Sequence, residues 1–218
     1  ARHIDFTDST ATVDKERFIK MCNLIIERGL NKEIEWVLET RVDVINRDIL
    51  KSAKKAGSEL IYFGLESGDD FILKNAHKNI NTEMSEKAIK MAVEEGLKVK
   101  VSFILGHPYE TVESARRTLE FGRKLKYNYG IDMYFNIIDI YPGTQLFDYV
   151  DQGVGGTKWI ENTRNNWKRY NRAEPMIEVN DLDRHKIVEV FNECQAMLKT
   201  APSEYSYKLK EDSKSEKR

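Results

Sequence analysis

Two charged residues stand at the ends of short apolar runs, where they could bind a ligand. Glu66 follows an apolar run that ends at Leu65, and Arg41 follows the run at Glu35–Leu38. A charge at the end of a buried run is costly unless it is paired. Glu66 is therefore expected either to pair with a cation or to accept hydrogen bonds from a hydroxyl or ammonium group of a ligand. A plain ion pair between Glu66 and Arg41 is the structural alternative.

A third apolar run breaks on glycine and proline at Gly106-His107-Pro108. This pattern is typical of a buried strand that ends in a ligand-binding loop, although Gly and Pro also mark ordinary turns. A lone histidine such as His107, without Cys or carboxylate residues at ligand spacing, does not predict a metal site. Asp8 follows the first apolar run, and its structural alternative is a turn or helix cap.

Other kinds of site find little support in the sequence. Cys22 and Cys194 fall within helical patterns and outside the predicted loops, so neither a disulfide nor a thiol nucleophile is expected. The glycine-rich stretch at 153–156 lacks the lysine and the preceding strand of a phosphate-binding loop. The sequence also shows no Ser/His/Asp arrangement.

The bulk composition describes a globular chain without a strong electrostatic bias. It has 218 residues, 33% of them charged, and a formal net charge of −1. This balance predicts no general attraction to nucleic acid or to an anionic membrane. The apolar runs are too short to span a bilayer, and cytoplasmic localisation is the default expectation. The chain starts at Ala1 and is expected to be a piece of a longer protein.

The elements that position these residues follow a repeating strand and helix pattern. Gly29, Gly57 and Gly96 each end an amphipathic run and precede a β-branched or aromatic run, as a left-handed helix cap before a strand would. Helices are predicted at 14–28, 48–56, 82–95 and 112–125. Strands are predicted at 3–6, 35–38, 60–64, 99–105 and 133–140.

Five strands that alternate with helices predict an α/β fold with a parallel sheet. Pairs such as Tyr62-Phe63 and Ile137-Ile138 favour strands buried on both faces. An open doubly wound sheet and a barrel both satisfy the pattern. In either fold the ligand lies at the carboxyl ends of the strands, which makes the following loops the informative ones: 7–12, 40–43, 66–69, 106–111 and 141–144.

The repeat stops near Asp151, which divides the chain into a barrel portion at 1–150, an extension at 151–200 and a tail at 201–218. The extension is expected to end in an amphipathic helix at about 182–198, and the polar tail to be disordered. The segment at 164–172 mixes basic and aromatic residues, as a nucleic-acid surface can. Packing of its aromatic rings on the domain is the favoured alternative.

Five stretches taken together resemble the core of a radical S-adenosylmethionine (radical SAM) enzyme, most closely the branch that often carries a cobalamin-binding domain. They cover roughly 4–150 and read IDFTDSTATVDKERF, ETRVDVINRDILKSAKKAG, IYFGLESGDDFILKNAHK, VSFILGHPYETVESARRTLEFG and YPGTQLFDYV. The resemblance implies a partial (β/α)6 TIM-like barrel with parallel strands. This chain would supply strands two to six, without the first strand and its cluster loop, and would add the C-terminal helical extension.

The resemblance also implies roles for individual residues. Glu66 matches the position that contacts the ribose of S-adenosylmethionine (SAM), and Ser102 replaces an Asp that does so in several relatives. Lys78 matches a basic residue near the methionine carboxylate. The other implied SAM contacts are Thr7, Asp8 and Ser9 at the methionine amino group, Gly106 and the backbone near Tyr141 around the adenine, and Arg41, whose target is less defined.

The family's C-x3-C-x2-C motif, which holds a 4Fe–4S cluster, does not occur in this sequence. Cys22 and Cys194 lie too far apart in the chain to replace it. The resemblance therefore implies an active radical enzyme as the intact parent, and a fragment that is inactive by itself. The implied cofactors are SAM, a 4Fe–4S cluster with ligands outside this chain and, in the related branch, cobalamin.

Two other functions fit the same residues. One is a cluster-free barrel that binds a ligand or a protein. The other is an ordinary barrel enzyme that uses Glu66 and Arg41 as acid, base or anion clamp, although no His or Lys is obviously paired with Glu66. The implied partners are an external electron donor and a substrate that the sequence leaves open between a small molecule such as a tetrapyrrole, a peptide and RNA. No membrane partner is expected, and the sequence does not define an oligomeric state.

Overall fold

The computed structural model describes residues 2–8, 10–170 and 173–199, and its centre is a sheet of five parallel strands. The strand order follows the sequence, β1-β2-β3-β4-β5. The sheet is open, which agrees with a partial barrel. Its strands are β1 (His3–Phe6), β2 (Glu35–Thr40), β3 (Ser58–Glu66), β4 (Lys98–Leu105) and β5 (Asp132–Ile137).

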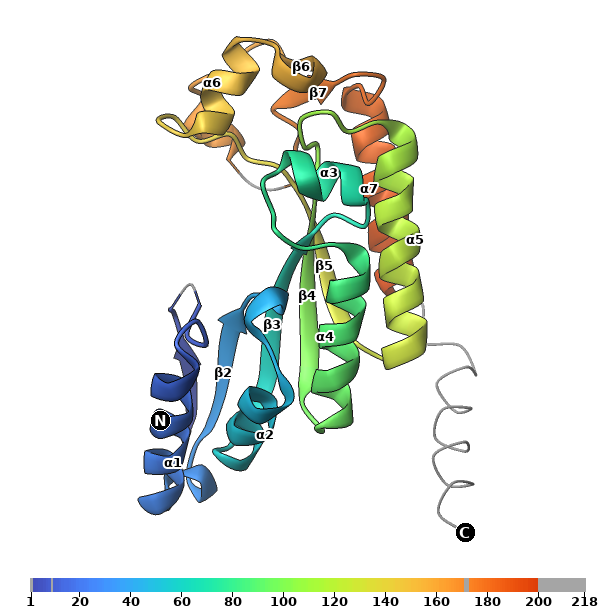
Figure 1. Ribbon diagram of the computed structural model, residues 1–218. Coiled ribbons are helices and arrows are strands. Elements are labelled where there is room, and N and C mark those ends of the chain that lie inside the picture. Colours follow the sequence, from blue (N-terminus) through green and yellow to red (C-terminus); the bar gives the residue numbers. More distant parts are fainter. Residues whose placement is uncertain (1, 9, 171–172, 200–218) are drawn as a thin grey trace.

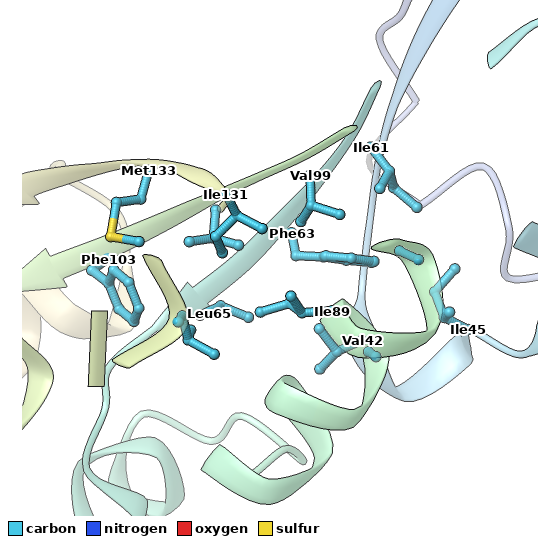
Figure 2. Packing of buried hydrophobic residues seen from close by; sticks show 14 of the residues in the cluster. Val42, Ile45, Ile61, Phe63, Leu65, Ile89, Val99, Phe103, Ile131 and Met133 are labelled. Atoms are coloured by element: carbon cyan, nitrogen blue, oxygen red, sulfur yellow. The ribbon is translucent and has the colours of Figure 1, made fainter. Parts of the chain in front are cut away.

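The long helices all pack on one face of this sheet (Figure 1). One core cluster joins apolar residues from every long helix to alternate residues of the strands, which favours a barrel-like fold over a doubly wound sheet. Figure 2 shows part of this cluster, with Phe63 and Leu65 near Ile89 and Phe103 near Met133. The helices are α1 (Lys15–Glu27), α2 (Arg47–Lys55), α4 (Thr82–Glu94), α5 (Val112–Tyr129) and α7 (Arg184–Lys199).

The second face of the sheet corrects the expectation of strands buried on both sides. In β3 and β4, buried residues alternate with half-buried ones, so Phe63 is buried while its neighbour Tyr62 is not. This alternation is the pattern of a strand with one packed face. Tyr62, Lys100, Ser102 and Tyr134 share the other face, which is called the inner face below.

A smaller unit lies beyond the carboxyl ends of β4 and β5 (Figure 1). It contains α6 (Gln145–Asp151) and a two-stranded antiparallel sheet of β6 (Thr157–Trp159) and β7 (Ile177–Val179), with its own apolar cluster. The sequence pattern predicted none of these three elements. It also missed α3 (Asp70–Asn75) and the short 3-10 turns at 30–32, 42–44, 154–156 and 167–169.

Most predicted elements are confirmed to within a few residues. The clearest difference is β5, which ends at Ile137 instead of Ile140 because the chain leaves the sheet there to enter the smaller unit. Gly29, Gly57 and Gly96 all have positive φ angles, at 70°, 92° and 76°. The predicted tail at 201–218 lies outside the described residues. No helix in the described part of the chain combines the length and the apolar content needed to span a membrane.

Candidate functional site

Glu66 lies at the carboxyl end of β3, in a conformation that sets it apart from the strand before it. The pairing of β3 with β4 shifts register between Gly64 and Glu66, and Glu66 has a φ of 66°. Non-glycine residues rarely adopt this left-handed region, and where they do the backbone often serves a site. The carboxylate Oε1 accepts a hydrogen bond from Lys78 Nζ at 2.8 Å, while Oε2 is buried without a partner among the described residues.

This contact corrects the alternative of a Glu66–Arg41 ion pair. Arg41 instead donates to both oxygens of Asp43, with its Nε 2.9 Å from Oδ1 and its Nη2 2.6 Å from Oδ2. Arg41 still lies close to the site, since it lines a small cleft of about 100 Å³ together with Gly64 and Lys78. Asp43 is only two residues from Arg41, so the two side chains meet without any tertiary contact. The pattern of residue types alone did not favour Asp43 over Glu66 as the partner of Arg41.

Gly64 brings the Glu66 carboxylate close to Ser102. A Cβ atom at Gly64 would lie 2.9 Å from Glu66 Oε1 and 4.0 Å from Ser102 Oγ. The missing side chain therefore leaves a space on the inner face that both polar groups border. These two residues were predicted to contact the same ribose, and the structure places them on adjacent strands at that space.

The loop after β4 is held by a buried carboxylate that the sequence pattern did not single out. Glu110 is 0% exposed, and its Oε2 accepts hydrogen bonds from the backbone N–H groups of Gly106 and His107. Burial raises the pKa of Glu110 to about 8, against the lowering effect of the two hydrogen bonds. The one sequence signal for this role was an acidic residue four positions after the glycine that ends the strand. That pattern does not distinguish a buried carboxylate from an ordinary polar loop residue.

His107 is the second residue of this loop whose part the sequence pattern missed. It is 8% exposed, and its Nε2 has no hydrogen-bond partner among the described residues. Burial lowers the pKa of His107 to about 4, with the charge of Glu66 acting in the opposite direction. The imidazole is therefore neutral at pH 7, and its Nε2 is a buried nitrogen without a hydrogen-bond partner among the described residues.

Glu66, Lys78 and His107 line one cavity of about 260 Å³. Polar groups enter it from the ends of β3 and β4 and from the turn before α4. Its remaining walls are mostly apolar and come from the strand ends and from α6, with Ala76, Ile104, Pro108, Ile138, Leu146 and Tyr149 among them. A small apolar cavity with a few convergent polar groups is the usual form of a cofactor site.

The other predicted site residues lie further from this cavity. Thr7 and Asp8 are exposed after β1, which is separated from β3 by β2 in the sheet. Tyr141 is exposed, with its ring 5.0 Å from that of Tyr170. Ser9 lies outside the described residues. Gly106 directly precedes His107 of the cavity lining, with a φ of 95° and its amide N–H donated to Glu110.

The two thiols do not fit the role of cluster ligands. Cys22 in α1 and Cys194 in α7 are both 0% exposed, and burial raises the pKa of each to about 12. A ligand thiol has to be deprotonated and accessible to iron. The described residues also contain no group of three or more His, Cys, Asp or Glu side chains placed to hold a metal ion.

We expect both thiols to resist iodoacetamide at pH 8 in the folded chain, because the thiolate is the reactive form and burial disfavours it. Mass spectrometry should find an unmodified chain after an exposure that alkylates free cysteine completely. The same treatment in urea is the control and should modify both residues. Alkylation of either thiol without denaturant would contradict this burial.

A parallel sheet with helices on one face and a cavity at its carboxyl edge defines a partial (β/α) barrel, a fold whose ligand sites lie at that edge. Residues 1–122 match the family described as Radical SAM superfamily. The chain belongs to this superfamily, which confirms the resemblance inferred from the sequence.

Relatives with curated descriptions include two that align over most of this chain. An uncharacterized methyltransferase of Pyrococcus horikoshii is 32% identical over 193 residues, which is 88% of this chain and 40% of the relative. The anaerobic magnesium-protoporphyrin IX monomethyl ester cyclase of Cereibacter sphaeroides is 26% identical over 84% of this chain and 28% of its own length. The chain thus spans less than half the length of these relatives.

Solved structures share the fold at low sequence identity. The radical SAM methyltransferase TsrM of Kitasatospora setae, with cobalamin and a 4Fe–4S cluster bound, has a TM-score of 0.61 at 15% identity, over 69% of this chain and 31% of TsrM. Coproporphyrinogen III oxidase of Escherichia coli also has a TM-score of 0.61, at 14% identity, over 90% of this chain and 41% of the oxidase.

Proposed function

We propose that this chain forms the SAM-binding barrel portion of a radical SAM enzyme, with the nucleoside end of SAM in the cavity beside Glu66. The observation that carries the proposal is that this cavity is lined by two residues with buried and unpartnered polar atoms, Glu66 Oε2 and His107 Nε2. Such atoms cost free energy unless a ligand pairs with them.

The residues of the cavity fit the chemical groups of SAM. The Glu66 carboxylate can accept hydrogen bonds from ribose hydroxyls. Ser102 remains a proposed second ribose contact, and it lines the hollow on the inner face next to this cavity. The neutral His107 ring can bond to an edge of the adenine, which the apolar walls would shield from water. Lys78 neutralises Glu66 and offers further N–H donors to a carboxylate. Thr7, Asp8 and Arg41 remain proposed contacts for the methionine end of SAM, and the backbone at Tyr141 for the adenine.

In the intact protein, bound SAM together with a reduced 4Fe–4S cluster would supply the radical chemistry. Since Cys22 and Cys194 do not fit as cluster ligands, we expect this chain alone to bind SAM without cleaving it. An external electron donor would then be a partner of the whole protein. Names of relatives such as methyltransferase, and TsrM with bound cobalamin, support cobalamin-dependent methyl transfer as the narrower proposal.

The test is calorimetric titration of the chain with SAM. Glu66→Gln should weaken binding at least about tenfold, because the neutral amide loses a charge-assisted bond and presents N–H groups to the ribose hydroxyls. The matched control is Glu59→Gln near the amino end of the same strand, where Glu59 pairs with Lys98. We expect this control to bind SAM like the unchanged chain. The proposal fails if the unchanged chain shows no saturable binding or if both variants behave alike.

A further inference from the structure

The glycine-rich stretch at 153–156, which has no part in the proposed function, lies against the loop after β4 that carries His107. The backbone N–H of Tyr109 donates to the carbonyl oxygen of Gly155 at 2.7 Å. A Cβ atom at Gly155 would lie 2.7 Å from the backbone nitrogen of Tyr109 and 2.9 Å from Pro108 Cβ. Gly155 therefore allows a contact between two backbones that a side chain would prevent.

Asn180 makes a second contact with this loop, from the turn after β7. Its backbone N–H donates to the carbonyl oxygen of Gly156 at 3.0 Å, and its Nδ2 donates to the carbonyl oxygen of Glu110 at 2.9 Å. The next residue, Asp181, accepts the backbone N–H of Val112 at 3.1 Å, at the start of α5. Asn180 thus joins the glycine-rich stretch to the loop after β4 through its two N–H groups.

The hydrogen bond from Asn180 reaches His107 through Glu110. Asn180 holds the main chain of Glu110, whose buried carboxylate accepts the N–H groups of Gly106 and His107. The backbone N–H of Glu110 also donates to the carbonyl oxygen of His107 at 3.0 Å, which closes the turn. Asn180 is not among the residues that line the cavity beside Glu66, but it holds the turn from which His107 enters that cavity.

The smaller unit that contains Asn180 also supplies a wall of the cavity. Leu146 and Tyr149 of α6 line it, and α6 packs on β6, with the ring centroids of Phe147 and Trp159 5.2 Å apart. Strand β6 pairs in turn with β7, next to Asn180. The wall and the contacts with the loop therefore belong to one packed unit, and the hold of this unit on the loop sets the width of the cavity.

We propose that Asn180 is a positioning residue for SAM binding, because its side-chain N–H fastens the smaller unit to the loop that carries His107. This inference deepens the proposed function and rests on it for the identity of the ligand. The structural alternative is that Asn180 only favours the turn after β7, since its φ of 51° lies in the left-handed region that asparagine tolerates. The two explanations differ in whether the side chain is needed.

The test replaces Asn180 with glycine, which adopts the same left-handed backbone and removes only the side chain. Asn162→Gly is the matched control, because Asn162 belongs to the same unit, has a φ of 64° and donates its side-chain amide to the neighbouring Glu161. In calorimetric titration, Asn180→Gly should weaken SAM binding at least about fivefold, which corresponds to one lost hydrogen bond of ordinary strength. Asn162→Gly should bind SAM like the unchanged chain.

A second measurement needs no SAM and follows the NMR signal of the His107 ring between pH 7.5 and pH 5.5. Burial holds the pKa of His107 at about 4, so the signal should not move in the unchanged chain or in Asn162→Gly. In Asn180→Gly the loosened loop admits water, the pKa rises towards its ordinary value, and the signal should move. The charged and titratable groups around the ring are the same in both variants: Glu66, His77, Lys78, Tyr149 and Glu110.

Circular dichroism confirms that each variant is folded under these conditions, so that a loss of stability alone cannot produce the shift. Asn180→Asp is the second variant if the glycine variant does not fold, because aspartate keeps the shape but cannot donate to Glu110. It should weaken SAM binding in the same way.

Two results would overturn the positioning role: equal SAM affinities in the Asn180 and Asn162 variants, or a His107 signal that stays fixed in both. If the unchanged chain binds SAM and the variants do not differ, only this inference is wrong. If no form of the chain binds SAM but the His107 signal moves in Asn180→Gly alone, the proposed function is wrong and the hold of Asn180 on the loop stands.

Discussion

Replacing Gly68 with alanine is expected to lower the free energy of unfolding by about 3 kcal/mol, because the new methyl group has no space. A Cβ atom at Gly68 would lie 2.7 Å from Thr118 Cα, 2.7 Å from Phe121 Cβ and 3.0 Å from the carbonyl oxygen of Arg117. Two of these atoms belong to the backbone of α5 and cannot turn away as a side chain could. The helix or the loop after β3 would have to move.

The same contact determines the position of Glu66. Gly68 donates its backbone N–H to Thr118 Oγ1 at 3.0 Å, and Ser67 Oγ lies 3.1 Å from the same oxygen. These bonds hold the loop after β3 against α5, two residues beyond Glu66. We therefore expect Gly68→Ala to weaken SAM binding as well as to destabilise the fold.

Chemical denaturation followed by circular dichroism measures the change in stability. Gly143→Ala is the matched control, since Gly143 has a φ of 81° but no atom within 4 Å of an added Cβ. Its cost should be limited to backbone strain, about 1 kcal/mol. Equal losses of stability in the two variants would contradict this prediction. They would mean that the loop after β3 and α5 move apart to admit the methyl group at little cost in free energy.

Removal of the Glu110 side chain is expected to cost about 3 kcal/mol of stability. Glu110→Ala would leave the buried N–H groups of Gly106 and His107 without their acceptor, and each unsatisfied group costs roughly 1–3 kcal/mol. Glu110→Gln keeps a carbonyl oxygen for both N–H groups and should be far less harmful. Urea denaturation of the two variants at pH 7 tests this order, and a glutamine variant as unstable as the alanine variant would contradict it.

The same carboxyl group predicts how stability depends on pH. The folded-state pKa of Glu110 is about 8, above the ordinary value of about 4.3 in the unfolded chain. The folded chain therefore keeps the proton that the unfolded chain releases between these values. This contribution to stability is complete below pH 4 and is lost as the pH rises through 8, with a slope of up to about 1.4 kcal/mol per pH unit.

Glu110→Gln cannot titrate and should lack this slope. Urea denaturation of the unchanged chain and of the Gln variant at several values between pH 5 and pH 8 provides the comparison. The difference in unfolding free energy should change steadily in favour of the variant as the pH increases. Parallel curves for the two proteins would show that Glu110 is ionised in the folded state.

The main sheet was predictable because its signals are local. Gly29, Gly57 and Gly96 adopt the left-handed conformation that ends a helix, and each is followed by a run with strand chemistry. The unit containing α6, β6 and β7 gave no such signal, because its elements are short and its core forms between segments distant in sequence. The sequence also failed to predict that buried and half-buried residues alternate along β3. Tyr62 was read as part of an apolar run, but it lies on the polar inner face of the sheet.

The site was predictable only where a charge interrupted an apolar run. This rule found Glu66, but its partner is Lys78, which reaches it from a separate turn after α3. Glu110 looked like a solvated loop residue, and only the fold shows that it is buried under two amides. The partners of a buried charge depend on tertiary packing, which residue types and spacing do not record.

The order of the sheet has a consequence for how the chain folds. Every strand pairs with the strand that follows it in sequence, from β1 with β2 to β4 with β5, so each new pairing closes only one helical connection. Short closures reduce the entropy lost before a contact forms, and they favour rapid folding in comparison with sheets of mixed strand order. The sheet can therefore grow one strand at a time in the direction of synthesis, with β3 and β4 already paired before the ribosome has completed α7.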